Sequence, residues 1–145
     1  MPKKEGFRGQ RSVVLPEFII RELKDDAVCS QLYVTDIGYY PDALHHQRTR
    51  EKGCNQFILI YCTRGEGWFS MMGKKKKVTE NQFILIPKNT PHSYGSSENN
   101  PWSIYWVHFS GWHASQFFDP EGNTGTILPS KIGHFSKNGQ SSLQI

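Results

Sequence analysis

The spacing of hydrophobic and polar positions changes once along the chain. After Pro16, the segment "EFIIRELKDDAV" places Phe18 and Leu23 on one side and charged residues on the other. This spacing predicts one short amphipathic helix over about 17–27, with the proline in the first turn. From about residue 31 the segments become short and rich in β-branched and aromatic residues, which is typical of strands.

The segments from about residue 31 to 112 read as closely spaced strands. "QFILIYC" (56–62) and "QFILI" (82–86) are almost continuously apolar, whereas "PWSIYWVHF" (101–109) alternates large side chains over a full strand length. Pro87 ends the second run because it has no N–H for a further ladder bond. Many short strands separated by Gly, Pro and Asn indicate a sandwich or barrel rather than a helical bundle.

The two ends of the chain lack this pattern. Residues 1–15 are basic and Gly-rich, so we expect a flexible N-terminal arm. Residues 16–112 form the predicted domain, and residues 113–145 are polar, rich in Gly and Ser, and predicted to be an irregular C-terminal tail. Because that tail ends without a capped element, we expect more polypeptide to follow it in the natural protein.

The spacing around His92 matches a turn of cupin-type jelly rolls. That turn reads Gly, five residues, Pro, one residue, Gly, two residues, His, and here Asn81, Pro87, Asn89 and His92 stand at the four named positions. Asparagine is the non-glycine residue that most readily accepts a positive φ, so both substitutions keep the backbone requirement. The resemblance implies a mainly β fold, a cupin-like jelly-roll barrel.

Metal-dependent cupins need further histidines upstream of this turn. The corresponding segment here, "EKGCNQFI", contains none. His45 and His46 are adjacent, so on a strand they would point to opposite faces and could not share one ion. Cys54 with one histidine does not make a metal site. We therefore expect no metal and no cofactor, and we expect His92 to hydrogen-bond the backbone of its own loop.

Aromatic residues near the predicted barrel mouth are candidates for ligand contact. Tyr94 has a ring that suits the face of a sugar and a hydroxyl that suits one of its OH groups, although it could equally plug the barrel end. Alternation places Ile104, Trp106 and His108 on one face of their strand. Trp106 is the better candidate for stacking on a carbohydrate, because a lone histidine such as His108 is more often a satisfied core residue.

Two arginines precede the long apolar runs. In "HHQRTR", alternation puts Arg48 and Arg50 on the same strand face. Pointing into the barrel, they would offer several donors to a polyhydroxy ligand or a carboxylate. Pointing outward, they would be ordinary surface charges, and the sequence leaves both options open.

Charge and cysteine content narrow the function classes. The net charge is +4, but the run Lys74 to Lys77 follows Gly73 between two strand-like segments and predicts a solvated hairpin turn rather than a nucleic-acid contact. Three cysteines without metal-type spacing indicate free thiols and a cytoplasmic protein. We expect neither a membrane span nor a secretory signal, and no serine or cysteine motif indicates a catalytic nucleophile.

Several motifs in order resemble one known family. "FILIYCTRGEGWF", "NQFILIPKNTPHSYG" and "NPWSIYWVHFSG", together with "LYVTDIGYYPDA" and "HHQRTREKG", are similar to the N-terminal effector-binding domain of AraC-type transcriptional regulators over about residues 15–112. The resemblance implies a non-enzymatic domain that binds a sugar or related small molecule and an arm that folds over the pocket. It also implies a homodimer in the full-length regulator, and DNA binding through a C-terminal domain absent from this chain.

The resemblance also implies site residues. The sugar-contacting arginine, tyrosine and tryptophan of the arabinose-responsive member fall on Arg50, Tyr94 and Trp106 of this chain. A histidine two residues before that tryptophan is replaced here by Ile104, which removes a polar contact and points away from arabinose itself. Two alternatives stay open: a metal-dependent cupin enzyme acting on a sugar or small metabolite, and a barrel packed solid with side chains that serves only for dimer contact.

Overall fold

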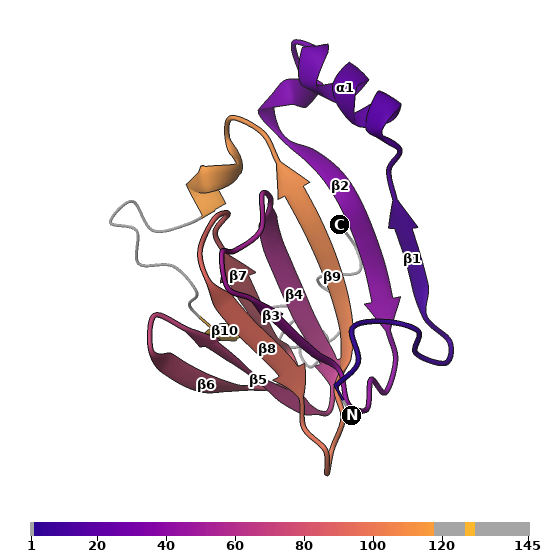
Figure 1. The fold of residues 1–145 in the computed structure, drawn as a ribbon, viewed down its shortest axis with the longest axis vertical. Coiled ribbons are helices and arrows are strands. Elements are labelled where there is room, and N and C mark those ends of the chain that lie inside the picture. The colour runs from indigo at the N-terminus through magenta and orange to yellow at the C-terminus, as the bar shows by residue number, and fades with distance from the viewer. Residues whose placement is uncertain (1, 118–126, 130–145) are drawn as a thin grey trace, which may run out of the picture.

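The computed structural model describes residues 2–117 and 127–129, which fold into two antiparallel sheets with a helix at one end (Figure 1). The elements in chain order are β1 (Arg11–Val14), α1 (Glu17–Asp25), the 3-10 helix η1 (Cys29–Gln31), β2 (Tyr33–Tyr40), β3 (Gln47–Arg50), β4 (Phe57–Arg64), β5 (Glu66–Met71), β6 (Lys74–Thr79), β7 (Gln82–Ile86), β8 (His92–Ser96), β9 (Ser103–Ser110), the 3-10 helix η2 (Ala114–Phe117) and β10 (Ile127–Pro129).

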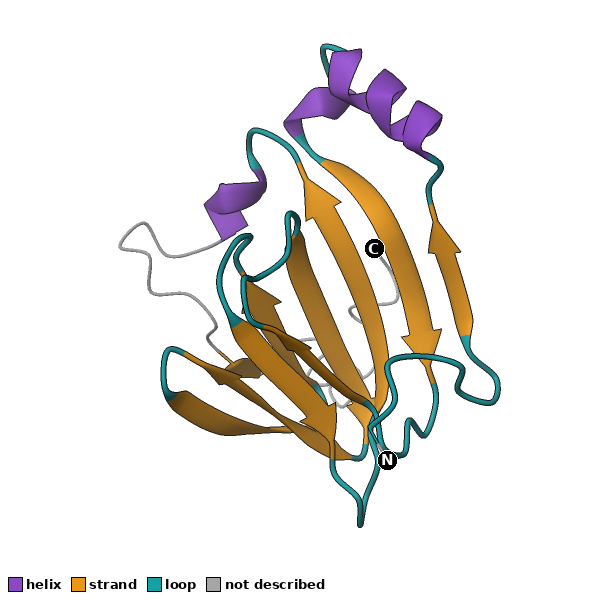
Figure 2. Ribbon diagram, viewed as in Figure 1, coloured by secondary structure: helices purple, strands orange, loops and turns teal. Residues whose placement is uncertain are grey.

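The two sheets form facing layers (Figure 2). The larger has the strand order β1-β2-β9-β4-β7-β10 and the smaller β3-β8-β5-β6, so strands distant in sequence lie side by side in both. Strand β9 lies between β2 and β4 within the large sheet. This arrangement confirms the predicted mainly β, cupin-like jelly-roll barrel with a short N-terminal helix.

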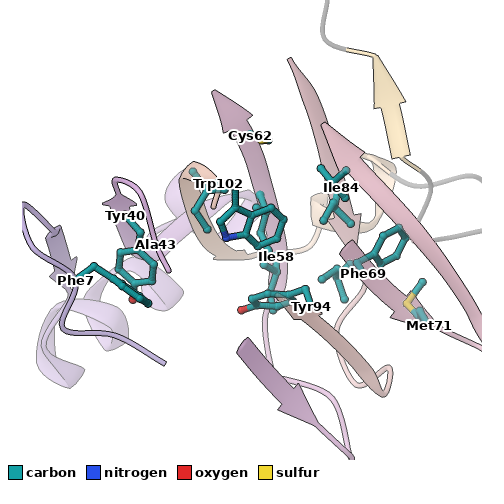
Figure 3. Packing of buried hydrophobic residues seen from close by; sticks show 14 residues of the cluster. Phe7, Tyr40, Ala43, Ile58, Cys62, Phe69, Met71, Ile84, Tyr94 and Trp102 are labelled. Carbon is teal, nitrogen blue, oxygen red and sulfur yellow. The ribbon is translucent and has the colours of Figure 1, made fainter. Parts of the chain in front are cut away.

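The core lies between the sheets and comes from the inward positions of the apolar strands. Ile58, Ile60, Ile84 and Ile86 are essentially inaccessible to solvent, and Trp102 is fully buried among them (Figure 3). Alternation along β4 and β7 places these side chains on one face of the large sheet. Burial of this apolar surface is the main force that holds the two sheets together.

Backbone conformations around the cupin-like turn agree with the sequence. Asn81 has a φ of 67° and Asn89 a φ of 59°, which confirms that the two asparagines replace glycines in the left-handed region. The prediction for the lysine run was wrong. Lys74 to Lys77 lie in strand β6, and the preceding turn is made by Met72 and Gly73, both with positive φ.

The helix is shorter and more exposed than its pattern predicts. It ends at Asp25 rather than near residue 27, none of its residues is buried, and Phe18 keeps 58% of its surface exposed. No helix within the described residues is long and apolar enough to cross a membrane. The three cysteines are free, as predicted.

Both predicted end segments contain regular structure. Within the predicted arm, β1 pairs with β2, and the backbone of Lys3 forms an isolated β-bridge with that of His46. The flexibility expected of residues 1–15 stays a prediction. Within the stretch predicted as an irregular tail, η2 and β10 are regular elements, and β10 pairs with β7. The rest of that predicted tail lies outside the described residues.

Candidate functional site

A cavity of about 180 Å³ lies between the two sheets, where the N-terminal segment crosses them. All six residues that the sequence singles out for ligand contact line it: Arg48, Arg50, Tyr94, Ile104, Trp106 and His108. The remaining lining residues are Lys4, Glu5, Ser12, Val14, Asp36, Tyr40, His46 and Ile60. The structure therefore brings the candidate residues together, and their contact with a ligand stays a prediction.

Arg50 is held in place by two neighbours on β8. Its Nη1 donates to the Tyr94 hydroxyl at 3.0 Å and lies 3.1 Å from Nε2 of His92. The pairing of β3 with β8 sets this up, since Arg50 lies opposite His92 and Arg48 lies opposite Tyr94. Both arginines line the cavity, so of the two options left open by the sequence the fold adopts the inward one.

His92 has a defined tautomer. Its Nδ1 lies 2.8 Å from the carbonyl oxygen of Thr90, and because a carbonyl only accepts, Nδ1 donates and Nε2 accepts from Arg50. Burial lowers the pKa of His92, assisted by the charges of Arg50 and Arg48 and opposed by the bond to Thr90. The predicted hydrogen bond from His92 to its own loop is thus confirmed.

Trp106 lies over a glycine on the neighbouring strand. Gly38 of β2 is directly opposite Trp106 in β9, and a Cβ at Gly38 would come within 2.5 Å of Cε2 and 2.8 Å of Nε1 of the indole. The glycine is therefore what allows the ring to lie flat beside the cavity. The indole Nε1 is buried and has no hydrogen-bond partner within the described part of the chain. Such an orphan donor costs about 1–3 kcal/mol.

His108, Asp36 and Thr35 form a cluster of polar side chains next to Trp106. His108 Nδ1 lies 3.0 Å from Oδ2 of Asp36, and the Thr35 hydroxyl donates to Oδ1 at 2.7 Å. Asp36 and Thr35 lie at a register irregularity between Val34 and Asp36 in the pairing of β2 with β9. Burial opposes ionisation of Asp36, but the hydrogen bonds from His108 and Thr35 outweigh it and lower the pKa of that carboxyl. His108 is both a partnered histidine and a cavity residue.

His46 and Tyr40 line the cavity, and Trp102 lies behind His46. Trp102 Nε1 donates to Nδ1 of His46 at 3.1 Å, so the neutral ring carries its proton on Nε2. Burial, reinforced by the charges of Arg48 and Arg50, lowers the pKa of His46 to about 4. Burial likewise raises the pKa of Tyr40 to about 12. Both side chains are therefore uncharged at neutral pH.

The N-terminal segment closes one side of the cavity. Phe7 is only 6% exposed, and its ring lies beside that of Tyr40 (Figure 3), with the two centroids 4.9 Å apart. Its centroid also lies 5.3 Å from that of His46. The Lys3 N–H donates to the carbonyl of His45 at 2.7 Å. These contacts bring Lys4 and Glu5 to the cavity wall.

The sequence interpretation missed several lining residues. Asp36 and Tyr40 alternate with Gly38 on β2, so an acidic residue within an apolar strand was an available signal. His46 was dismissed because it neighbours His45, but the φ of 66° at His45 interrupts the alternation on which that argument rests. Nothing in the sequence of the arm indicated that Phe7 would anchor it.

A second groove lies apart from the candidate residues. A broader open groove of about 760 Å³, bounded by residues of α1, η1 and the ends of β2 and β9, contains none of the six candidate residues. Among residues 2–117 and 127–129, no group of three or more His, Cys, Asp or Glu side chains could hold a metal ion.

The sequence of this chain is similar to known proteins. The family model described as the AraC-like ligand binding domain matches residues 38–130, more than half of the chain. This chain belongs to that family. The MmsAB operon regulatory protein of Pseudomonas aeruginosa is 27% identical over 101 residues, which are 67% of this chain and 33% of the relative. The lactose operon transcription activator of Staphylococcus xylosus is 35% identical over 54 residues, 37% of this chain and 19% of the relative.

Among solved structures, apo ToxT from Vibrio cholerae resembles this member of the AraC-like family with a TM-score of 0.52 and 10% sequence identity. The match covers 75% of this chain and 46% of that chain, and at this identity it concerns the fold alone. The aligned part of the chain spans a third or less of the length of the two regulators above. Both of these relatives are regulators of transcription by name.

Proposed function

We propose that this domain senses a sugar or related small molecule for a DNA-binding transcription regulator, binding it in the cavity without a metal. The observation that carries the proposal is the convergence of Arg50, Tyr94 and Trp106 on one cavity bordered by the N-terminal segment. A flat aromatic ring beside converging hydrogen-bond donors is what recognises a small polar ring compound. Membership of the AraC-like ligand binding family supports the same function.

Each residue has a definite role in the proposed complex. Trp106 stacks on the ligand ring. Arg50, already oriented by Tyr94 and His92, uses its remaining N–H groups as donors. Arg48 and His108 add polar contacts, and Ile104 supplies an apolar wall.

The N-terminal segment transmits binding. Since Lys4 and Glu5 line the cavity, a ligand there touches the docked arm and binds the docked state better than the undocked one. The shifted arm equilibrium then acts on a DNA-binding domain elsewhere in a longer protein. We further propose a cytoplasmic regulator that works as a homodimer and contacts DNA only through that other domain.

The competing function, a metal-dependent cupin enzyme, requires histidine lone pairs facing the cavity. His92 uses its Nε2 lone pair on Arg50, and His46 uses its Nδ1 lone pair on Trp102. Each neutral imidazole has only one such lone pair, so neither ring can ligate a metal in this arrangement. His108 also lines the cavity, with its Nδ1 engaged by Asp36, but one histidine alone does not make a metal site. These bonds favour a binding domain over an enzyme.

The test is a thermal-shift screen against monosaccharides, uronic acids and short oligosaccharides, with and without EDTA. A compound that binds only the folded state raises the melting temperature, and we expect a rise with one compound class that EDTA does not change. Trp106→Ala should abolish that rise while the circular dichroism spectrum stays native. A melting temperature lowered by EDTA alone would instead support the metal-dependent enzyme.

A further inference from the structure

We propose that the ligand of this cavity is a small carboxylate, such as a sugar acid or hydroxy acid of single-ring size, held through its carboxylate by Arg48 and Arg50. This inference rests on the proposed sensing function and narrows its ligand class. It comes from the balance of charge, the balance of donors and acceptors, and the size of the cavity.

The charge balance of the lining is positive. The lining contains three basic side chains and two acidic ones: Lys4, Arg48 and Arg50 against Glu5 and Asp36. Asp36 is already engaged at both oxygens, by His108 and Thr35. None of the three basic side chains has an ion-pair partner within the part of the chain that the structure describes. Glu5 has no ion-pair partner among the described residues either, so the unpaired charges of the lining are three positive and one negative, and their sum is positive.

The hydrogen-bonding groups are similarly one-sided. His46 offers Nε2–H because its Nδ1 accepts from Trp102. The indole N–H of Trp106 is unpaired but inaccessible to solvent and lies against Gly38, so it is not counted among the donors that reach a ligand. Arg48 adds up to five N–H donors, and its guanidinium has no hydrogen-bond acceptor among the described residues. A neutral polyol brings donors and acceptors in equal measure, whereas a carboxylate brings only acceptors. The donor-rich lining matches the carboxylate better.

The two guanidinium groups carry like charges and line the same cavity. Arg48 and Arg50 share one face of β3, and the charges of both act on His46 and His92 to disfavour protonation. An anion between them offsets these like charges and allows the two-pronged geometry in which arginine binds carboxylates most strongly. Desolvation of the site strengthens that attraction further.

Cavity size limits the ligand to a small molecule. Its volume of about 180 Å³ is below the roughly 300–1,000 Å³ that is typical of pockets for drug-sized ligands. A volume of this size holds a single sugar-acid ring or a short hydroxy acid, whereas an oligosaccharide would extend out of it.

The experiment follows the indole N–H signal of Trp106 by NMR in ¹⁵N-labelled protein, with the signal assigned through Trp106→Phe. The probes are two matched pairs: D-galacturonate with D-galactose, and glycerate with glycerol. We expect the acid of at least one pair to shift the signal at concentrations at least tenfold lower than its neutral partner. Arg48→Gln should weaken that binding roughly 10- to 100-fold, the loss expected for a charge-assisted hydrogen bond.

Controls separate this inference from the function it rests on. Arg64→Gln removes an exposed arginine paired with Asp42 and should leave the titration unchanged, while Arg48→Lys should recover part of the affinity. If a neutral sugar shifts Trp106 as well as its acid, the carboxylate inference is overturned and the sensing function stands. A signal that no acid moves at millimolar concentration also overturns it. The sensing function itself fails only if the broad thermal-shift screen and the Trp106→Ala comparison detect nothing.

Discussion

At the scale of single residues, the cavity depends on positions where a side chain is missing as much as on those where one is present. Gly38 leaves the space that Trp106 occupies, and Gly67 leaves the space over which Trp102 packs. A methyl group at either site would meet ring atoms of the indole. The position of the proposed stacking residue is therefore set by the neighbouring strand rather than by Trp106 alone.

Replacing Gly38 with alanine tests this dependence. The added Cβ would overlap the Trp106 ring, and overpacking of this kind typically costs about 1–3 kcal/mol. We expect Gly38→Ala to lower the free energy of unfolding in urea by that amount and to weaken ligand binding by displacing the indole.

A double-mutant cycle provides the control. Trp106→Phe removes part of the indole that the new methyl group meets, so Gly38→Ala should destabilise the Trp106→Phe protein less than it destabilises the wild type. Equal losses of stability in the two backgrounds would show that the cost of alanine at position 38 does not come from the indole.

Single residues also show what sequence alone could predict. Alternation along β3 and β9 brought Arg48, Arg50 and Trp106 to one cavity, because a two-residue period fixes which side chains share a face. It could not find Asp36, which lies beside a register irregularity, or His46, which follows a residue with positive φ. Backbone irregularities of this kind arise from tertiary packing and leave no periodic signal.

At the scale of elements, the part of the N-terminal segment that precedes β1, residues 2–10, is attached at few points, whereas β1 itself is paired with β2. Phe7 supplies its main apolar contact, while backbone bonds join Lys3 to His45 and Gln47. Neighbouring arm residues Lys4 and Glu5 are exposed to solvent on their outer sides. An element with one buried anchor can open locally without unfolding the barrel, and such opening is what a sensing arm requires.

Phe7→Ala should release the arm. Burial of a phenylalanine is worth about 1.5–3 kcal/mol, so hydrogen-exchange protection of the Lys3 and Gln47 amides should fall roughly 10- to 100-fold while that of β4 amides is kept. Val13→Ala, which truncates a side chain already 57% exposed on β1, should leave this protection intact. Unchanged exchange in Phe7→Ala would mean that the backbone bonds alone hold the arm.

Strand β6 presents a different requirement, because it is an edge of the small sheet. Lys74 and Lys76 lie opposite Met71 and Phe69 on the inner face of the sheet, which also carries the buried Val78, but at this edge both lysines are exposed to solvent. Charges on the inner face of an edge strand hinder a second molecule from adding a strand. This explains how a lysine run that resembles a turn in sequence can form a strand.

Replacing both inward lysines with valine should promote self-association. We expect Lys74→Val with Lys76→Val to form larger species by size-exclusion chromatography and light scattering at concentrations where the wild type does not. The matched control, Lys75→Val with Lys77→Val, adds the same apolar content on the opposite face, next to Trp68 and Glu66. Equal self-association of both variants would show that the apolar content of β6 drives association and that the sheet face on which the side chains lie does not.

At the scale of the whole molecule, the jelly-roll was predictable because its signals repeat along the chain. Apolar runs, turn residues and the spacing from Asn81 to His92 all agree with one architecture, and each is a local property. Docking of the arm, in contrast, joins Phe7 to Tyr40 and His46 through contacts between separate segments. A contact of this kind depends on the finished fold, so no local sequence pattern predicts it.

The buried histidines make the stability of the whole domain depend on pH. His46 has an ordinary pKa of 6.5 when unfolded and about 4 in the native state, because burial and two arginines disfavour its charged form. Between these values the unfolded chain binds a proton that the native state does not, so the free energy of unfolding falls as the pH falls. His92 is shifted in the same direction, whereas Asp36 loses its contribution only near and below its ordinary value of 3.8.

The expected loss from His46 is about 3 kcal/mol on going from above pH 6.5 to pH 4, since each pKa unit corresponds to about 1.36 kcal/mol. Urea unfolding from pH 7.5 to 4.5 should show this decline in the wild type and a smaller one in His46→Gln, whose amide oxygen can still accept from Trp102. His45→Asn removes the adjacent exposed histidine, suits the positive φ there, and should keep the full decline. If His46→Gln instead follows the wild-type curve over the whole range, His46 does not carry the pH dependence and its native pKa lies near the ordinary value.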